Sequence, residues 1–136
     1  MKTYKETLEV RTDKRCQMID ITGQVAAVIE KSGISEGTVT VFCPHTTAAI
    51  TINENADPDV VHDMLMTLEE IFPKNRPGYR HNEGNSDAHM KSSLTGASET
   101  IIVSGGEMEL GVWQGIYFCE FDGARNRRAI VSVIGN

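Results

Sequence analysis

Hydrophobic and polar residues alternate along several short stretches of this 136-residue chain. Such alternation predicts β-strands, since successive side chains of a strand point to opposite faces. Thr12 and Asp13 separate the first two of these stretches and are typical turn formers, so we expect a hairpin there. The predicted strands are residues 3–10, 14–21, 37–43, 45–53, 99–104, 116–121 and 127–134.

Two other stretches repeat their apolar residues at the helical period. Residues 23–32 follow Thr22, a possible N-cap, and precede Gly33, which suits a left-handed C-cap. A second helix is expected at residues 58–72, because Asp57 is a good N-cap and is followed by proline. Its polar side carries His62, expected to be exposed, while its apolar stripe should bury against a sheet. The stripe comprises Val60, Val61, Met64, Leu65, Leu68, Ile71 and Phe72.

The predicted strand at residues 45–53 has two different faces. One face carries Thr46, Ala48, Ile50 and Ile52 and resembles a core face, whereas the other carries small and polar residues. We interpret the second face as the lining of a cavity, and the alternatives are a face packed against another layer or washed by solvent. The second face consists of His45, Thr47, Ala49, Thr51 and Asn53.

Length and composition indicate one domain, residues 1–136, with ordinary hydrophobic (40%) and charged (24%) fractions. No stretch is apolar for the roughly 18 residues that a membrane span requires. The N-terminus lacks the apolar core of a signal peptide, which favours a cytoplasmic protein. A net charge of −6 argues against a nucleic-acid binder. Three distant cysteines, Cys16, Cys43 and Cys119, lie in apolar runs and suggest buried thiols.

The segment HNEGNSDAHMK, residues 81–91, contains two of the four histidines and no apolar run. Asn85 or Ser86 could begin a short helix that ends at Gly96. We consider His45, His81 and His89 as ligands of a divalent metal, since imidazoles commonly bind such ions. In one continuous helix the last two rings would lie about 12 Å apart along the axis, but Gly84 can break the helix and let them converge.

Two further clusters carry groups suited to chemistry. Asn53 and Glu54 lie between a strand end and a helix start, where Glu54 could act as a general acid or base and Asn53 as a turn former or substrate ligand. In FDGARNRR, residues 121–128, Arg125 could clasp a phosphate, whereas Arg127 is expected in a solvated turn. Gln114 could face a pocket, and the adjacent Trp113 is expected in the core.

Three motifs in this order closely resemble those of the YjbQ family of small bacterial and archaeal proteins. They are CPHTTAAITINENADPDV, HNEGNSDAHMKSSLTGASETIIV and GEMELGVWQGIYFCEFDGARNRR, and the match extends from Val39 to Val133. The resemblance implies an α+β domain with a β-sandwich-like core and two to three flanking helices. It also implies a homotrimer.

The same resemblance implies a secondary thiamine-phosphate synthase activity, which joins a pyrimidine diphosphate to a thiazole phosphate and releases pyrophosphate. A divalent metal, Zn or Mg, would suit that reaction. The resemblance marks His45, Thr47, Asn53, Glu54, His81, Asn85, His89, Gln114 and Arg125 as candidate site residues.

The leading hypothesis is therefore a metal-assisted enzyme acting on a small phosphorylated molecule. In it, Glu54 and His81 are catalytic, and His45, His81 and His89 bind the metal. The substrate ligands are Thr47, Asn53, Asn85, Gln114 and Arg125. The alternative is a noncatalytic protein that binds a phosphorylated metabolite or a metal, and a third class is an interaction module in which the polar face of residues 45–53 lies in a subunit contact.

Overall fold

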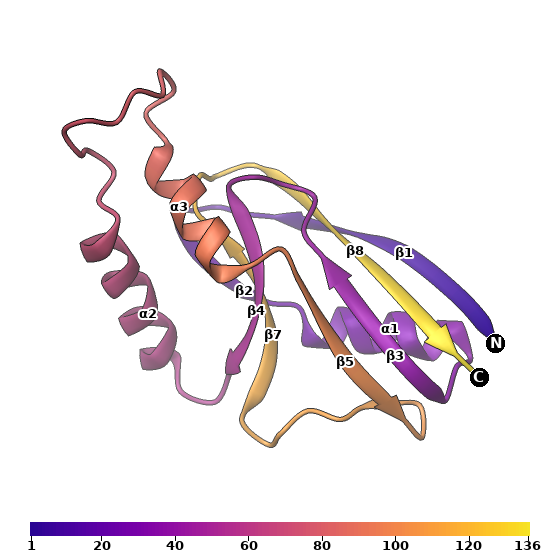
Figure 1. The fold of residues 1–136 in the computed structure, drawn as a ribbon. Coiled ribbons are helices and arrows are strands. Elements are labelled where there is room, and N and C mark those ends of the chain that lie inside the picture. The colour runs from indigo at the N-terminus through magenta and orange to yellow at the C-terminus, as the bar shows by residue number, and fades with distance from the viewer.

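A computed structural model describes all 136 residues as eight strands and three helices (Figure 1). Each predicted strand and helix has a counterpart, and only the two-residue β6 was not predicted. The elements are β1 (Lys2–Arg11), β2 (Gln17–Asp20), α1 (Thr22–Ser32), β3 (Glu36–Phe42), β4 (Ala48–Glu54), α2 (Pro58–Ile71), α3 (Ser86–Thr95), β5 (Ser98–Ser104), β6 (Glu107–Met108), β7 (Gln114–Glu120) and β8 (Asn126–Gly135).

The strands form two antiparallel sheets, with the orders β1-β8-β3-β5-β6 and β2-β7-β4. The predicted hairpin between the first two strands is wrong, because β1 pairs with β8 and β2 pairs with β7. The turn at Thr12 instead carries the chain from one sheet to the other. Its backbone N–H donates to the carbonyl of Arg125 at 3.0 Å, so pairing with the C-terminal part of the chain prevails over the local turn.

The main hydrophobic core lies between the two sheets and α1. Alternate residues of β8 face it, as the period of a strand requires. Each fully buried aliphatic or aromatic side chain contributes about 1.5–3 kcal/mol relative to an exposed one. The sheets supply Val39, Val41, Ile50, Ile101, Val103, Ile116, Phe118, Ala129, Val131 and Val133 to this core.

Helix α1 confirms one predicted cap and corrects the other. Gly33 adopts a left-handed conformation (φ 68°) and ends the helix, as predicted. Thr22 is the first helical residue, and Ile21 occupies the N-cap without a side-chain hydrogen bond. The Thr22 hydroxyl donates to Asp20 at 2.6 Å and accepts from the backbone N–H of Ile116 at 2.8 Å. Thr22 therefore ties the start of the helix to β7 and does not cap it.

On the second face of β4, Ala49 belongs to a small second core, whereas Thr51 borders a cavity next to α2 and α3. Ala49 is fully buried against Ala88 of α3 and against Tyr117 and Cys119 of β7. The cavity interpretation is therefore wrong for Ala49, and packing against another layer is confirmed. His45 and Thr47 precede β4, which begins at Ala48, so the strand is shorter at this end than predicted.

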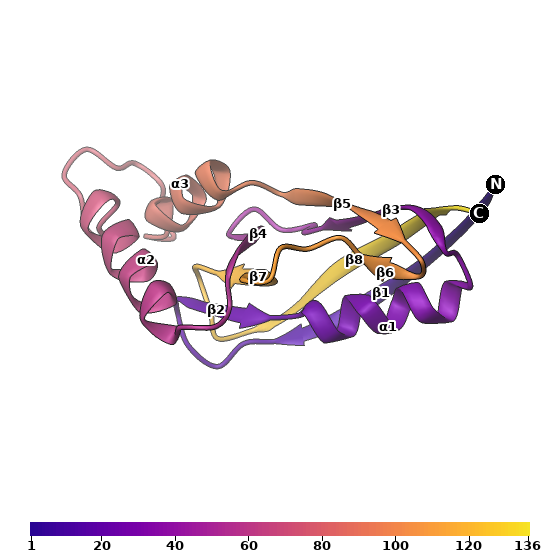
Figure 2. The same cartoon turned by 90° about the horizontal axis from the view of Figure 1, so that it is seen from below.

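Helices α2 and α3 lie at the end of the molecule away from the chain termini (Figures 1 and 2). The predicted N-cap of α2 is confirmed, because the Asp57 carboxylate accepts from the backbone N–H of Asp59 at 2.9 Å. The apolar stripe of α2 is not buried against a sheet as expected. None of its residues is fully buried, although Val61, Leu65 and Leu68 touch the second core.

The three cysteines are unpaired and differ in their burial. Cys43 and Cys119 are buried, Cys16 is half-buried, and all three are free. Burial raises the pKa of Cys119 to about 12 and that of Cys43 to about 11, so both are inert core thiols.

None of the three helices combines the length and the apolar character needed to traverse a bilayer.

Candidate functional site

The polar segment before α3 brings two predicted site histidines together. Gly84 has φ 70°, a conformation that suits glycine, and lies between His81 and the start of α3. The rings of His81 and His89 then meet nearly perpendicularly, with centroids 5.4 Å apart. The segment is thus a loop followed by a helix, as expected.

A polar pocket of about 420 Å³ lies where this segment meets the residues before β4 and after β7. It collects six of the nine predicted site residues: His45, Thr47, His81, Asn85, His89 and Arg125. Five further residues complete its lining: Pro44, Thr46, Glu83, Asp122 and Arg127. Three segments far apart in the sequence therefore build one site.

His45 is held at the edge of this pocket as a neutral ring. Its Nε2 accepts a hydrogen bond from the backbone N–H of Arg128 at 3.1 Å. Burial lowers the pKa of His45, and the nearby Arg127 charge lowers it further. The proton of the neutral ring therefore lies on Nδ1, because Nε2 is the acceptor.

Asn85 is buried and supports the site from beneath. Its Nδ2 donates to Asp122 at 2.8 Å and, more weakly, to Glu83 at 3.4 Å. Its Oδ1 lies 2.8 Å from Nδ1 of His81. The side-chain amide thus has protein partners on both sides, and Asn85, predicted as a substrate ligand, also lines the pocket.

A buried ion pair forms the floor of the pocket. Arg127 is 6% exposed, and its guanidinium bonds Glu120, which is fully buried, and the hydroxyl and carbonyl of Thr47. Burial alone would raise the pKa of Glu120, but hydrogen bonds from Arg127, the Asp122 backbone and Thr12 lower it below its usual value. The expectation that Arg127 lies in a solvated turn is wrong.

Arg125 is half exposed and lies at the rim of the pocket. Its Nη2 donates to the Asp122 carboxylate at 3.0 Å, and its Nε donates to the Asp122 carbonyl at 2.9 Å. The remaining guanidinium N–H groups are free for an anion. Arg125 therefore presents free N–H groups at the rim of the pocket.

Three predicted site residues lie at the other end of β4. Glu54 pairs with Gln114 and Asn53 pairs with Gly115 across β4 and β7, whereas the histidine pocket adjoins the Ala48 end. Seven strand residues span roughly 20 Å. Within one chain, Glu54, Asn53 and Gln114 therefore do not reach the pocket. Trp113, predicted in the core, is 60% exposed near them.

A buried charge network fixes α3 beneath the pocket. Asp87 is fully buried and accepts from both guanidinium nitrogens of Arg15 and from Lys91, which also bonds Glu69 of α2. Burial alone would raise the pKa of Asp87, but these hydrogen bonds lower it to about 2. The network ties α3 to both α2 and the β1–β2 connection.

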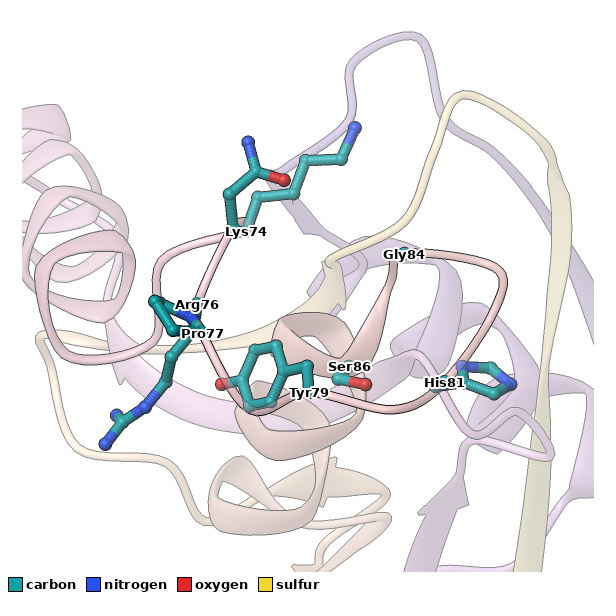
Figure 3. A pocket seen from close by; sticks show the side chains of 8 residues that line it. Lys74, Arg76, Pro77, Tyr79, His81, Gly84 and Ser86 are labelled. Carbon is teal, nitrogen blue, oxygen red and sulfur yellow. The ribbon is translucent and has the colours of Figure 1, made fainter.

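His81 also borders a second cavity of about 440 Å³, shown in Figure 3. Residues 73–86 curve around this cavity, and Lys74 and Arg76 extend in different directions. Their charges do not converge on one point.

The residues present fit part of a metal site. His81 and His89 offer two imidazoles at a separation compatible with one ion, and imidazole suits Zn and related metals better than Mg. No group of three or more His, Cys, Asp or Glu side chains is arranged to hold a metal ion. The third predicted ligand, His45, borders the pocket but uses Nε2 for the Arg128 backbone.

Similarity to known proteins agrees with this architecture. The UPF0047 protein YugU of Bacillus subtilis is 54% identical over 130 residues, covering 96% of this chain and 98% of that protein. A crystal structure of a YjbQ/UPF0047-family protein from Clostridium acetobutylicum is 53% identical, with a TM-score of 0.93 over 95% of this chain and 99% of that one.

A second structure, of a YbjQ-like protein from Sulfolobus solfataricus, superposes with a TM-score of 0.95 at 34% identity and covers 99% of both chains. The family model described as "UPF0047 protein YjbQ-like" matches residues 6–136. With its two curled antiparallel sheets, three helices and near-complete match, this chain belongs to the YjbQ family.

Proposed function

We propose that this protein is a metal-assisted enzyme that acts on a small phosphorylated substrate. The observation that supports it best is the polar pocket in which His45, His81 and His89 lie with Arg125 and Thr47. A phosphate group needs cations and hydrogen-bond donors, and this pocket supplies both. Its 420 Å³ is in the range of small-molecule sites.

Each side chain of the pocket has a distinct role in this proposal. Arg125 binds a phosphate oxygen through its free N–H groups, and Arg127, paired with Glu120, fixes Thr47 at the floor of the pocket. Neutral His45 offers the N–H of its Nδ1 as a further donor. These groups stabilise the negative charge that gathers on a leaving phosphate or pyrophosphate.

The divalent ion is proposed to bind to His81 and His89, with water and phosphate oxygens as its other ligands. When bound, it would polarise phosphate oxygens as a Lewis acid. Two protein ligands make a weak site, so the ion and the phosphorylated molecule should bind cooperatively. Zn, or a similar ion that accepts imidazole, fits this pair better than Mg.

Thiamine-phosphate synthase is proposed as a secondary activity of this site. In that reaction the bond from the pyrimidine methylene carbon to the diphosphate oxygen breaks, and pyrophosphate departs with the electron pair. A bond forms between that carbon and the thiazole nitrogen. Both reactants carry phosphate, which agrees with the chemistry of the pocket.

One observation favours the alternative of binding without turnover. Glu54, the predicted general acid or base, lies at the far end of β4, so one chain does not bring it to the histidines. A noncatalytic protein that holds a phosphorylated metabolite needs no such group. Turnover measurements therefore separate the two proposals.

We further propose a cytoplasmic location and a homotrimer, and the outer face of the five-stranded sheet supports the homotrimer. Cross-strand neighbours share a face, and here three rows of side chains adjoin one another that are all apolar or hydroxyl-bearing except Lys5. Phe42, Ile102 and Ile134 are 43%, 59% and 42% exposed. The rows are Thr3-Ile134-Thr38-Ile102, Lys5-Ser132-Thr40-Thr100 and Thr7-Ile130-Phe42-Ser98. A second copy of the chain would cover this face.

The function is tested with protein that carries no histidine tag. Metal content and zinc affinity are measured with and without inorganic pyrophosphate, for the wild type, for His89→Ala and for the matched control His62→Ala on exposed α2. The proposal expects binding that pyrophosphate strengthens and that only His89→Ala weakens. Equal zinc affinity of all three proteins would refute the metal site.

Turnover is then followed by phosphorus NMR over a panel of phosphate and pyrophosphate esters, including the pyrimidine diphosphate with the thiazole phosphate. Product formation that depends on His89 supports an enzyme. Binding of these esters with no product at stoichiometric protein supports the noncatalytic alternative.

A further inference from the structure

The carboxylate of Asp122 lies two hydrogen bonds away from His81. Asn85 connects them, with its Nδ2 donating to Asp122 at 2.8 Å and its Oδ1 at 2.8 Å from Nδ1 of His81. Asp122 was not among the predicted site residues. It is itself held by Arg125 at 3.0 Å, while Arg15 lies 3.9 Å away.

The surroundings of Asn85 determine which way its amide points. Carboxylates only accept hydrogen bonds, so the NH₂ group of Asn85 must face Asp122 and Glu83. Rotating the amide by 180° would place its oxygen against the Asp122 carboxylate. The amide oxygen therefore faces His81, and Nδ1 of His81 must be the donor.

We propose that Asp122 is a positioning residue that, through Asn85, holds the proton of His81 on Nδ1 and leaves the lone pair on Nε2. A neutral histidine can bind a metal or accept a proton only through its unprotonated ring nitrogen. The hydrogen-bond partner of the other, protonated nitrogen determines which of the two nitrogens is unprotonated. Asp122 thus determines that His81 presents the lone pair of Nε2, and not that of Nδ1, to the pocket. The binding of a metal by Nε2 rests on the proposed function. The tautomer of His81 does not depend on that function.

The direct test is the tautomer of His81 in the metal-free protein. Long-range proton–nitrogen NMR correlation spectra of ¹⁵N-labelled protein distinguish protonated from unprotonated ring nitrogens. The wild type should show Nδ1–H and an unprotonated Nε2. In Asp122→Leu the Asn85 amide loses its main anchor, so the Nε2–H form of His81 should become populated.

Two variants separate positioning from a general structural effect. Asp122→Asn keeps an acceptor oxygen for Asn85 and should retain the wild-type tautomer. Glu83→Gln weakens the 3.4 Å contact with Asn85 and removes the carboxylate charge that lies 4.0 Å from Nε2 of His81. Because a carboxylate beside Nε2 favours a proton on Nε2, this variant should also retain the Nδ1–H form. The resonances of His62, far out on α2, report whether each variant keeps the fold.

Zinc titration, without substrate, gives a second readout. Loss of an outer partner of a metal-binding histidine typically weakens the metal about 10- to 100-fold, and Asp122→Leu should show this while Asp122→Asn should not. A wild-type His81 protonated on Nε2, or an unchanged tautomer in Asp122→Leu, would overturn the inference. If the wild type binds no zinc but shows the expected tautomers, the proposed function fails and the positioning role stands.

Discussion

Arg127 of β8 reaches across the pocket floor to Glu120 of β7, and both side chains are withdrawn from solvent. Removal of one partner leaves an uncompensated buried charge, which typically costs about 3–5 kcal/mol. Arg127→Leu should therefore lower the free energy of unfolding by about that amount. Urea denaturation followed by circular dichroism measures it.

Arg128→Leu is the matched control for this change, because Arg128 is adjacent, exposed and free of ion pairs. It should shift the unfolding free energy by less than about 0.5 kcal/mol. The double variant Glu120→Leu, Arg127→Leu should be more stable than Arg127→Leu alone. Equal stability of Arg127→Leu and Arg128→Leu would contradict a structural role for the pair.

The buried carboxylate of Asp87 predicts a specific acid sensitivity. Its pKa is lowered to about 2 in the folded protein, against an ordinary aspartate value of 3.8. Because the folded pKa is the lower one, this stabilisation is present above about pH 4 and is lost as the pH falls towards 2. The wild type should lose about 2 kcal/mol over that range from this group.

Asp87→Asn removes that titration, so its stability should depend less on pH between 4 and 2. Urea midpoints at closely spaced pH values measure the difference, and the exposed Asp63 provides the control variant Asp63→Asn. Parallel pH profiles of Asp87→Asn and the wild type would show that the network does not govern acid stability.

Arg125 carries the predicted affinity for anions. Hydrogen bonds to charged groups are typically worth about 1.5–3 kcal/mol, so Arg125→Leu should weaken pyrophosphate binding about tenfold or more. Calorimetric titration with inorganic pyrophosphate measures this loss. Arg76→Leu, on the loop bordering the second cavity, should leave the affinity unchanged; an equal loss in both would place the anion elsewhere.

Much of the fold follows from local pattern. The alternation along residues 127–134 predicted the strand β8, and Gly33 and Asp57 marked helix ends through backbone requirements that act locally. The partners of β1 and β2 were not predictable in this way. Their pairing with β8 and β7 depends on contacts between residues about a hundred or more positions apart, which a turn-like Thr12 cannot reveal.

The candidate site likewise contains some residues that the sequence pattern predicted correctly and others that it did not. The polar segment at residues 81–91 identified His81 and His89, and the motifs added His45 and Arg125, all in one pocket. Arg127 was misjudged although a signal existed. It shares the inward face of β8 with Ala129, Val131 and Val133, so the period of the strand places it inside.

Asp122 and the distant position of Glu54 required the three-dimensional structure. Asp122 follows β7, and only the packing of α3 brings it to Asn85. Glu54 is close to the histidine motif in sequence, but an extended strand separates it from His45 in space. Glu54 and His45 are therefore close in sequence but distant in space, because the strand between them is extended.

The outer sheet face predicts how the assembly can be broken. Ile102 lies in an uncharged row with Thr38 and Ile134, so Ile102→Lys would place a charge within the proposed subunit contact. Burying an unpaired charge is strongly unfavourable, and the proposed trimer should dissociate to monomers. Light scattering coupled to size-exclusion chromatography measures the mass of each variant.

Val112→Lys is the control, because Val112 is 86% exposed on the connection between β6 and β7 and does not belong to that face. It should remain trimeric. A monomeric wild type would refute the trimer, and a trimeric Ile102→Lys would show that another surface joins the copies. The half-buried stripe of α2 then becomes the surface to alter, since it also leaves apolar side chains such as Ile71 exposed.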